Sequence, residues 1–191
     1  MYSVKKIISV FLIMFMFVTV VSAQTKKEIK KFKIKSATVV VTDIVDGKEK
    51  TRTDSYQKFD NAGNTIEDVE YNKDGTLKKK ETRQYNKNND PVEEIIYDEK
   101  GNIKKKTTTE YNSSNDKITE IVYDGKGAIT EKTQYGYNAK EEKIYEITFD
   151  NKGNTLKKSI YTYDRNSLKI EKKTTDAKGA VIAVKKYTYE Y

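Results

Sequence analysis

The stretch that decides the fold is YDEKGNI at residues 97–103, which returns as YDGKGAI at residues 123–129. Each copy begins with an aromatic residue followed by Asp, and Gly stands fourth after the aromatic. Related positions recur at alternating steps of 12 and 14 residues, so a 26-residue unit is copied about five times. Repeats of about 20 to 50 residues are typical of a quasi-linear array rather than of one globular core. The series consists of Phe59, Tyr71, Tyr85, Tyr97, Tyr111, Tyr123, Tyr137, Phe149, Tyr163 and Tyr189, with Thr175 in place of an aromatic.

Each step between aromatics is predicted to form one strand and one tight turn, because Val, Ile, Thr and Tyr lie between clusters of Asn, Asp and Gly. Gly or Asn in the fourth position predicts a three-residue hairpin loop, a type I turn plus a bulge, which needs one residue with positive φ. Glu141 and Ser167 occupy this slot in two turns, and we expect those hairpins to use another turn type or to be looser. The predicted structural turn residues are Gly63, Gly75, Asn89, Gly101, Asn115, Gly127, Gly153 and Gly179.

The predicted fold class is all-β: an antiparallel β-meander of tandem hairpin repeats, with about 12 strands in a strongly twisted or coiled sheet. Such loops place Tyr71 opposite Leu77 and Tyr97 opposite Lys79, so the register climbs two residues for every two strands. A sheet with that stagger is expected to coil. Because both step lengths are even, we expect all odd-numbered residues, tyrosines included, to share one face on the inside of the coil.

The first residues predict export. A short basic segment precedes an apolar run of about 15 residues, which is shorter than the roughly 20 that a membrane span needs, and small residues follow at the cleavage position. We therefore expect an exported chain that starts at Gln24, is periplasmic, cell-surface or extracellular, and keeps no stable membrane anchor after cleavage. The predicted segments are a signal peptide at 1–23, a mobile basic lead-in at 24–32, a degenerate leading hairpin at 33–58 and the repeats at 59–191.

The composition limits which catalytic and metal-binding sites the chain can form. The chain has neither His nor Cys, so the usual nucleophile and base pairs and the commonest zinc ligands cannot be assembled. The Asp residues after the aromatics stand where a turn is capped and lack the alternating acids of a calcium loop. We predict no catalytic, cofactor-binding or metal-binding residue, and no enzyme. Nucleic acid is not an expected partner, although the net charge is +8.

The stretches at 97–103 and 123–129, together with YTYD at 161–164, resemble the YD repeats of the Rhs and teneurin-type family. The resemblance covers residues 59–191 and implies a coiling β-sheet. Long members of that family wrap into shells around a toxic domain. This chain is far too short for a shell, so the resemblance implies a small stand-alone repeat protein and not toxin delivery.

The main functional prediction is a non-enzymatic scaffold or protein-interaction module. The alternative is binding of carbohydrate or of an anionic envelope polymer, because tyrosines can stack on sugar rings while lysines meet anionic groups. The open strands at each end could also pair into oligomers. The candidate binding ladder consists of Tyr71, Tyr85, Tyr97, Tyr111, Tyr123, Tyr137, Tyr163, Lys79 and Lys105.

Overall fold

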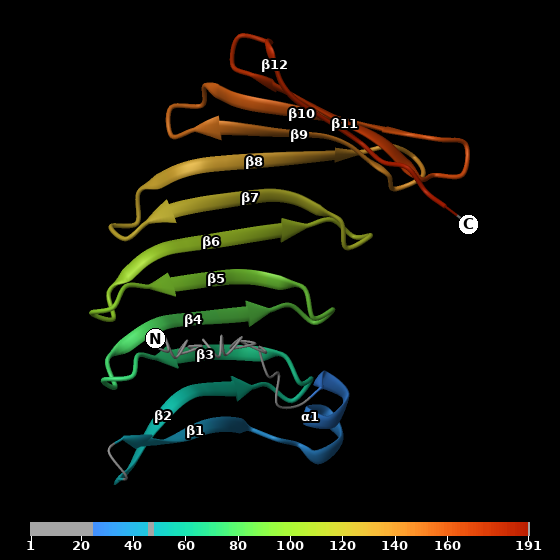
Figure 1. Cartoon of the computed structure of the whole chain (residues 1–191). Helices are drawn as coiled ribbons and strands as arrows, with labels where there is room; N and C mark the ends of the chain where they lie inside the picture. Colours follow the sequence, from blue (N-terminus) through green and yellow to red (C-terminus); the bar gives the residue numbers. More distant parts are fainter. Residues whose placement is uncertain (1–24, 46–47, 191) are drawn as a thin grey trace, which may run out of the picture.

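The computed structural model describes residues 25–45 and 48–190. Within these residues lie one short helix and twelve strands, and each strand pairs antiparallel with the next in a single sheet (Figure 1). The predicted all-β meander is confirmed. The elements are α1 Lys26–Phe32, β1 Ser36–Val45, β2 Lys48–Phe59, β3 Thr65–Tyr71, β4 Leu77–Tyr85, β5 Pro91–Tyr97, β6 Ile103–Tyr111, β7 Lys117–Asp124, β8 Ile129–Tyr137, β9 Lys143–Asp150, β10 Thr155–Tyr163, β11 Lys169–Asp176 and β12 Val181–Lys186.

The hairpin turns after β2 share one hydrogen-bonding pattern, as the repeat predicts. In the turn between β5 and β6, Gly101 N–H donates to the Asp98 carbonyl at 3.0 Å, and Asp98 N–H donates to the Asn102 carbonyl at 2.8 Å. The Asp98 carboxylate accepts the backbone N–H groups of Lys100 and Asn102, at 2.9 and 2.8 Å. Gly101 has φ +81°. The aspartate therefore caps the turn, and the glycine supplies the left-handed residue that the loop requires.

Glu141 and Ser167 do not change the turn, so the expectation of another turn type is wrong. They have φ values of 62° and 63°, and their N–H groups bond to the carbonyls of Asn138 and Asp164 as in the other turns. A left-handed residue other than Gly costs about 1 to 2 kcal/mol. The side-chain cap of Asn138 or Asp164 and the pairing of two strands outweigh that cost.

Each of these hairpins also contains a further bulge, in the strand beyond the loop, that sequence reasoning missed. Tyr71 pairs with Leu77 as predicted, but Glu70 then pairs with Lys79, so Lys78 is an extra residue on β4. The same insertion follows every turn after β2. In each case the extra residue is the second residue of the strand that follows the turn. The predicted stagger is kept. Val69 on β3 and Tyr97 on β5 both oppose Lys80 on β4, so Tyr97 stands level with Val69 and not with Tyr71, its counterpart one repeat earlier.

The bulges overturn the prediction that all odd-numbered residues share one face. Directly opposed residues lie on the same face of a sheet, and Tyr97 opposes Lys80 rather than Lys79. One extra residue per strand reverses the numbering parity, so odd positions face one way on β3, β5, β7 and β9 and the other way on β4, β6, β8 and β10. We name the two sides the aliphatic face, which carries Val69, Ile95, Ile121 and Ile147, and the stacked face, which carries Tyr135, Glu146, Ser159 and Tyr161.

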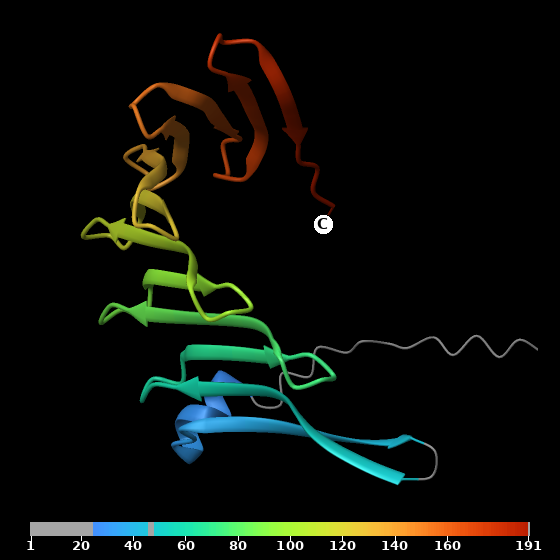
Figure 2. The ribbon, with the colours of Figure 1, turned by 90° about the vertical axis from the view of Figure 1, so that its left-hand side faces the viewer.

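The sheet twists along its length, and its C-terminal strands curl over (Figure 2). On β10, Ser159 and Tyr161 are buried, whereas Lys158 and Ile160, which alternate with them, are exposed. The stacked face is therefore the inside of the curl in this region. Since Tyr123 and Phe149 lie on the aliphatic face, the predicted single inner face of aromatics is not formed. The sheet is not closed, because β1 and β12 are its two separate edges.

The N-terminal part differs from the predicted mobile lead-in. Residues 26–32 form α1, which starts with a capping box between Thr25 and Glu28 and buries Ile29. The helix packs against the turn after β2, where a Cβ at Gly63 would lie 2.8 Å from the Lys26 carbonyl oxygen. β1 and β2 pair over the segment predicted as a leading hairpin. The predicted signal peptide at 1–23 lies outside the described residues, among which no helix is long and apolar enough to cross a membrane.

Candidate functional site: lysines and aromatics on two faces

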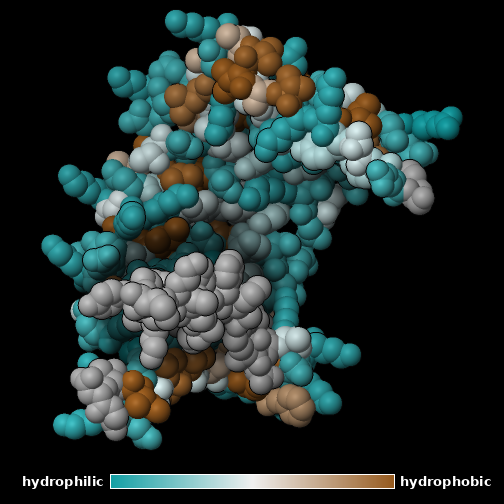
Figure 3. Space-filling view, viewed as in Figure 1, coloured by the Kyte–Doolittle hydropathy of each residue, from teal (hydrophilic) through white to brown (hydrophobic). Residues whose placement is uncertain are grey.

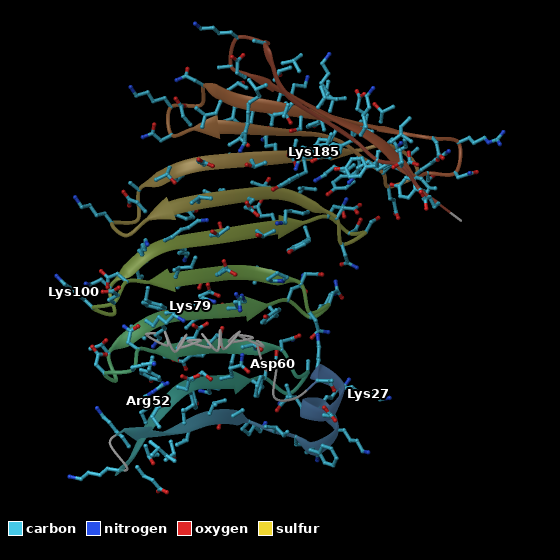
Figure 4. The ribbon with its side chains drawn as sticks, viewed as in Figure 1. Lys27, Arg52, Asp60, Lys79, Lys100 and Lys185 are labelled. Carbon is cyan, nitrogen blue, oxygen red and sulfur yellow. The ribbon has the colours of Figure 1, made fainter. Side chains whose placement is uncertain are left out.

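The structure divides the predicted binding ladder between the two faces of the sheet. Both lysines lie on the stacked face: Lys79 opposes Glu70, and its ammonium group lies 3.3 Å from a Glu81 carboxylate oxygen (Figure 4). Lys105 opposes Ile96 and Asp124. The ladder as predicted is therefore not one continuous surface. On the aliphatic face lie Tyr71, Tyr97 and Tyr123, and on the stacked face lie Tyr85, Tyr111, Tyr137, Tyr163, Lys79 and Lys105.

The ladder tyrosines of the stacked face connect neighbouring strands. Each hydroxyl donates to a backbone carbonyl 20 residues earlier, as from Tyr111 to Pro91 at 3.0 Å and from Tyr137 to Lys117 at 2.9 Å. Tyr85 and Tyr163 repeat this contact with Thr65 and Lys143. Burial raises the pKa of all four phenols. These hydroxyls hold the start of an adjacent strand, which is a structural role.

A second set of tyrosines on the stacked face forms an alternating stack with lysines. The Lys143 ammonium lies 5.2 Å from the centroid of the Tyr135 ring and 4.6 Å from that of Tyr161. Lys169 lies 5.0 Å from the Tyr161 ring and 5.7 Å from the Tyr187 ring. Cation–π contacts of this kind contribute about 0.5 to 1 kcal/mol each at exposed sites and more when desolvated. Sequence reasoning missed the stack, although both residue types recur in it at 26-residue spacing.

Glu146 is the anionic centre of the stack. Its carboxylate accepts the Tyr161 hydroxyl at 2.6 Å and the ammonium groups of Lys172 and Lys143 at 2.6 and 3.1 Å. Burial opposes the charge, but the hydrogen bonds from Lys172, Tyr161 and Lys143 outweigh it and lower the pKa of Glu146 to about 2. Burial and the nearby Glu146 carboxylate raise the pKa of Tyr161 well above its usual range. The Glu146 carboxylate is thus charged at neutral pH and hydrogen-bonded to three groups of the stack.

The aliphatic face carries two similar shallow pockets, one between β6 and β7 and one between β8 and β9. Their volumes are about 310 and 360 Å³. In the first, Lys106 directly opposes Tyr123, and in the second, Lys132 directly opposes Phe149. Because of the bulge, the lysine that shares a face with Tyr123 is Lys106, one residue beyond the predicted Lys105. The corresponding lining residues are Ile103, Lys106, Thr108, Tyr123, Asp124 and Gly127 in the first pocket and Ile129, Lys132, Gln134, Phe149, Asp150 and Gly153 in the second.

The acidic residue of each pocket belongs to its turn. The Asp124 carboxylate accepts the backbone N–H groups of Lys126 and Ala128, both at 2.9 Å. Asp150 does the same with Lys152 and Asn154. Across residues 25–45 and 48–190, no group of three or more Asp or Glu side chains is placed to hold a metal ion. The pockets therefore combine an aromatic ring, an aliphatic side chain and one lysine, which is a set of groups for binding.

No protein-family model and no curated protein matches this chain. Several solved structures are similar to this chain at a distance. A porin-like protein from Bacteroides uniformis has a TM-score of 0.39 and 14% identity over 73% of this chain and 55% of its own. TarM has a TM-score of 0.30 and 16% identity over 68% and 22%, and TcdB2-TccC3-Cdc42 has 0.31 and 10% over 80% and 9%. The chain spans at most about half the length of these proteins, and such low similarity supports no inference about what it binds.

Proposed function

We propose that this protein is an exported, non-enzymatic β-repeat protein that acts as a scaffold or protein-interaction module at the periplasm or cell surface. The observation that supports the proposal is a single-layer sheet with almost no core. Among the described residues, the buried hydrophobic side chains are Ile29, Phe59, Val69 and Tyr161. Most side chains on both faces thus stay accessible to a partner, on a frame that hairpin pairing keeps in register.

The exposed apolar residues at the two ends of the sheet support an interaction role. Ile44 on β1 and Ile182 on β12 are 74% and 59% exposed. In Figure 3, hydrophobic surface lies over the C-terminal strands at the top of the view and over the first strands at the bottom, among hydrophilic side chains. Exposed apolar surface on a polar protein is typical of an interaction site.

Site-specific photo-crosslinking tests the interaction proposal in intact cells. A crosslinking residue is placed at Thr107 on the stacked face, at Thr108 on the aliphatic face or at Ala183 on the edge strand β12. The three positions sample the two faces and one edge of the sheet, and each of them lies within a strand. We expect a discrete crosslinked product from one face or edge and not from the others. Absence of any product at all three positions contradicts the interaction role.

Export is tested separately by the N-terminal sequence of the protein recovered from the cell envelope. The proposal predicts a chain that starts at Gln24, because small residues precede this position at the end of the apolar run. A chain that keeps its first 23 residues and fractionates with the cytoplasm contradicts export.

A second candidate function is the binding of an anionic envelope polymer. It is favoured by the two pockets of the aliphatic face, in which a lysine lies beside an aromatic ring. This candidate replaces the predicted ladder with Lys106 and Tyr123 in one pocket and Lys132 and Phe149 in the other. Binding that weakens as salt is added distinguishes it from an interaction with a neutral sugar, since salt screens charge pairs at a surface.

A further inference from the structure

The two pockets on the aliphatic face are copies of one design. Every position of the first has its counterpart 26 residues later, and the Lys, the aliphatic Ile, the turn Asp and the turn Gly are conserved between the two copies. The aromatic position changes only from Tyr123 to Phe149. Two other lining positions differ, with Thr108 and Gly125 in the first pocket replaced by Gln134 and Asn151 in the second. A ligand that uses both pockets therefore meets a lysine, an aliphatic side chain and an aromatic ring twice.

The distance between the pockets follows from the sheet. Neighbouring strands lie about 4.8 Å apart, so positions two strands apart are separated by about 10 Å across the sheet. The stagger of two residues adds a displacement along the strands, which brings the spacing to about 12 Å. This is close to the length of two sugar rings in an extended chain. A linear polymer presents identical groups at a fixed spacing along its chain. The surface of a globular partner does not generally repeat at this interval.

Each pocket has one lysine that an anionic ligand can contact, beside one aspartate that belongs to the turn. Lys132 forms no ion pair with any described residue, and the Lys106 ammonium lies 2.5 Å from a Glu93 carboxylate oxygen. Asp150 is occupied by the backbone N–H groups of its own turn. Lys132 is therefore open to an anionic ligand, whereas Lys106 reaches one only by leaving Glu93, an exchange that costs little because surface ion pairs contribute little to stability. One lysine per pocket then matches one negative charge per two sugars.

The pocket floors are open and apolar. In the first pocket, an added Cβ at Gly125 would lie 2.1 Å from the Ile103 carbonyl oxygen, so this turn lies directly against the start of β6. The second pocket has Asn151 at the equivalent position. Ile103 and Ile129 are each about two-fifths exposed, at 41% and 42%. Each pocket thus offers an apolar floor and an aromatic edge, against which the apolar face of a sugar ring can lie.

We propose that the aliphatic face binds an extended acidic polysaccharide with about one carboxylate or sulfate per two sugars, one such unit in each pocket. The inference rests on the second candidate function above and specifies its ligand. Lys106 and Lys132 meet the anionic groups, and Tyr123 and Phe149 contact sugar rings. Because both pockets lie on one frame, binding in the first raises the effective concentration for the second.

The test uses the chain from Gln24 to Tyr191 and fluorescently labelled oligosaccharides of two, four and six sugars. Three acidic series are compared: alternating glucuronic acid and N-acetylglucosamine, its sulfated counterpart, and a uniform uronic acid chain. A neutral N-acetylglucosamine series of equal lengths is the control. For the alternating glucuronic acid and N-acetylglucosamine series, which carries one carboxylate per two sugars, anisotropy titration is expected to show affinity rising about tenfold or more from two to four or six sugars, since two pockets then act together.

Matched lysine variants locate the binding surface. Lys132→Gln and Lys106→Gln are each expected to weaken binding of the longest acidic oligosaccharide about five- to tenfold, as for the loss of one charge contact. Lys105→Gln is the control, because it removes the same charge from the same strand on the other face. Its affinity is expected to stay within about twofold of the parent protein. Lys106→Gln also leaves Glu93 without its ion pair and can lower stability for that reason. Lys132→Gln breaks no ion pair among the described residues, so its effect on binding still tests the surface.

Three results overturn the inference: the alternating acidic series does not bind, the neutral series binds as tightly, or Lys105→Gln weakens binding as much as Lys106→Gln and Lys132→Gln. Each of these leaves the photo-crosslinking experiment to decide the scaffold proposal. A crosslinked protein partner with no oligosaccharide binding thus rejects the polysaccharide and keeps the interaction module.

Discussion

Replacement of Tyr161 tests whether the lysine and tyrosine stack holds the curled end of the sheet together. The side chain is 6% exposed. Its ring lies within 4.6 to 5.2 Å of the ammonium groups of Lys143, Lys169 and Lys172, and its hydroxyl donates to Glu146. No other described tyrosine combines this burial with as many charged contacts.

Two variants separate the hydroxyl from the ring. Tyr161→Phe removes one hydrogen bond to a charged group and is expected to cost about 1.5 kcal/mol of unfolding free energy. Tyr161→Ala also removes a buried ring and its cation–π contacts, and is expected to cost about 4 kcal/mol. Tyr163→Phe is the matched control, since it removes a hydrogen bond to the neutral Lys143 carbonyl from the same strand and is expected to cost about 1 kcal/mol.

Urea unfolding followed by far-ultraviolet circular dichroism measures these differences, with the slope m showing whether a two-state analysis holds for the repeat array. Thermal unfolding in high salt adds a second reading, because partly exposed cation–π and ion pairs weaken when screened. A cost below about 1 kcal/mol for Tyr161→Ala, similar to that of an exposed residue, refutes the stack as a stabilising element.

Three further predictions address the turns, the pH dependence and the edges. Glu141→Gly is expected to raise stability by about 0.5 to 1 kcal/mol in urea unfolding, because Gly adopts the left-handed conformation of that turn freely; a loss of stability contradicts the shared turn. Since the folded pKa of Glu146, about 2, lies below its ordinary 4.5, its contribution to stability is present above pH 4.5 and is lost as pH falls toward 2. Acid unfolding should show this loss in the parent protein and not in Glu146→Gln, and equal acid sensitivity of the two refutes it. Val184→Lys on β12 is expected to reduce any concentration-dependent association in sedimentation, because a charge on an edge strand opposes pairing; unchanged association excludes that edge.

The architecture was predictable because the turn chemistry repeats. An aromatic followed by Asp or Asn, with Gly or Asn four residues after the aromatic, identifies most of the hairpins after β2, and Tyr71 pairs with Leu77 as that chemistry implies. The stagger between strands also follows from the step lengths alone. Strand order needed no further information, since consecutive hairpins in a meander pair with their neighbours.

The faces were not predictable from periodicity because one inserted residue per hairpin is invisible in the spacing of the aromatics. Because of the bulge, Tyr123 pairs with Lys106 instead of Lys105. Odd-numbered residues of neighbouring strands therefore lie on opposite faces of the sheet. One signal was present: aliphatic residues such as Ile118 and Ile144 recur every 26 residues at the second position of a strand, which is the bulged position. Helix α1 was missed because seven residues dominated by lysine resemble a solvated lead-in, although Thr25 and Glu28 form a capping box.

The central claim is that a bulge in each hairpin places successive aromatics of the repeat on opposite faces of one sheet. Cross-strand nuclear Overhauser effects between the backbones of β6 and β7 measure this register directly. The structure predicts contacts between Lys106 and Tyr123 and between Thr108 and Ile121. Contacts of Tyr123 with Lys105 and of Ile121 with Thr107 in their place would mean a regular hairpin without the bulge, and would contradict the account.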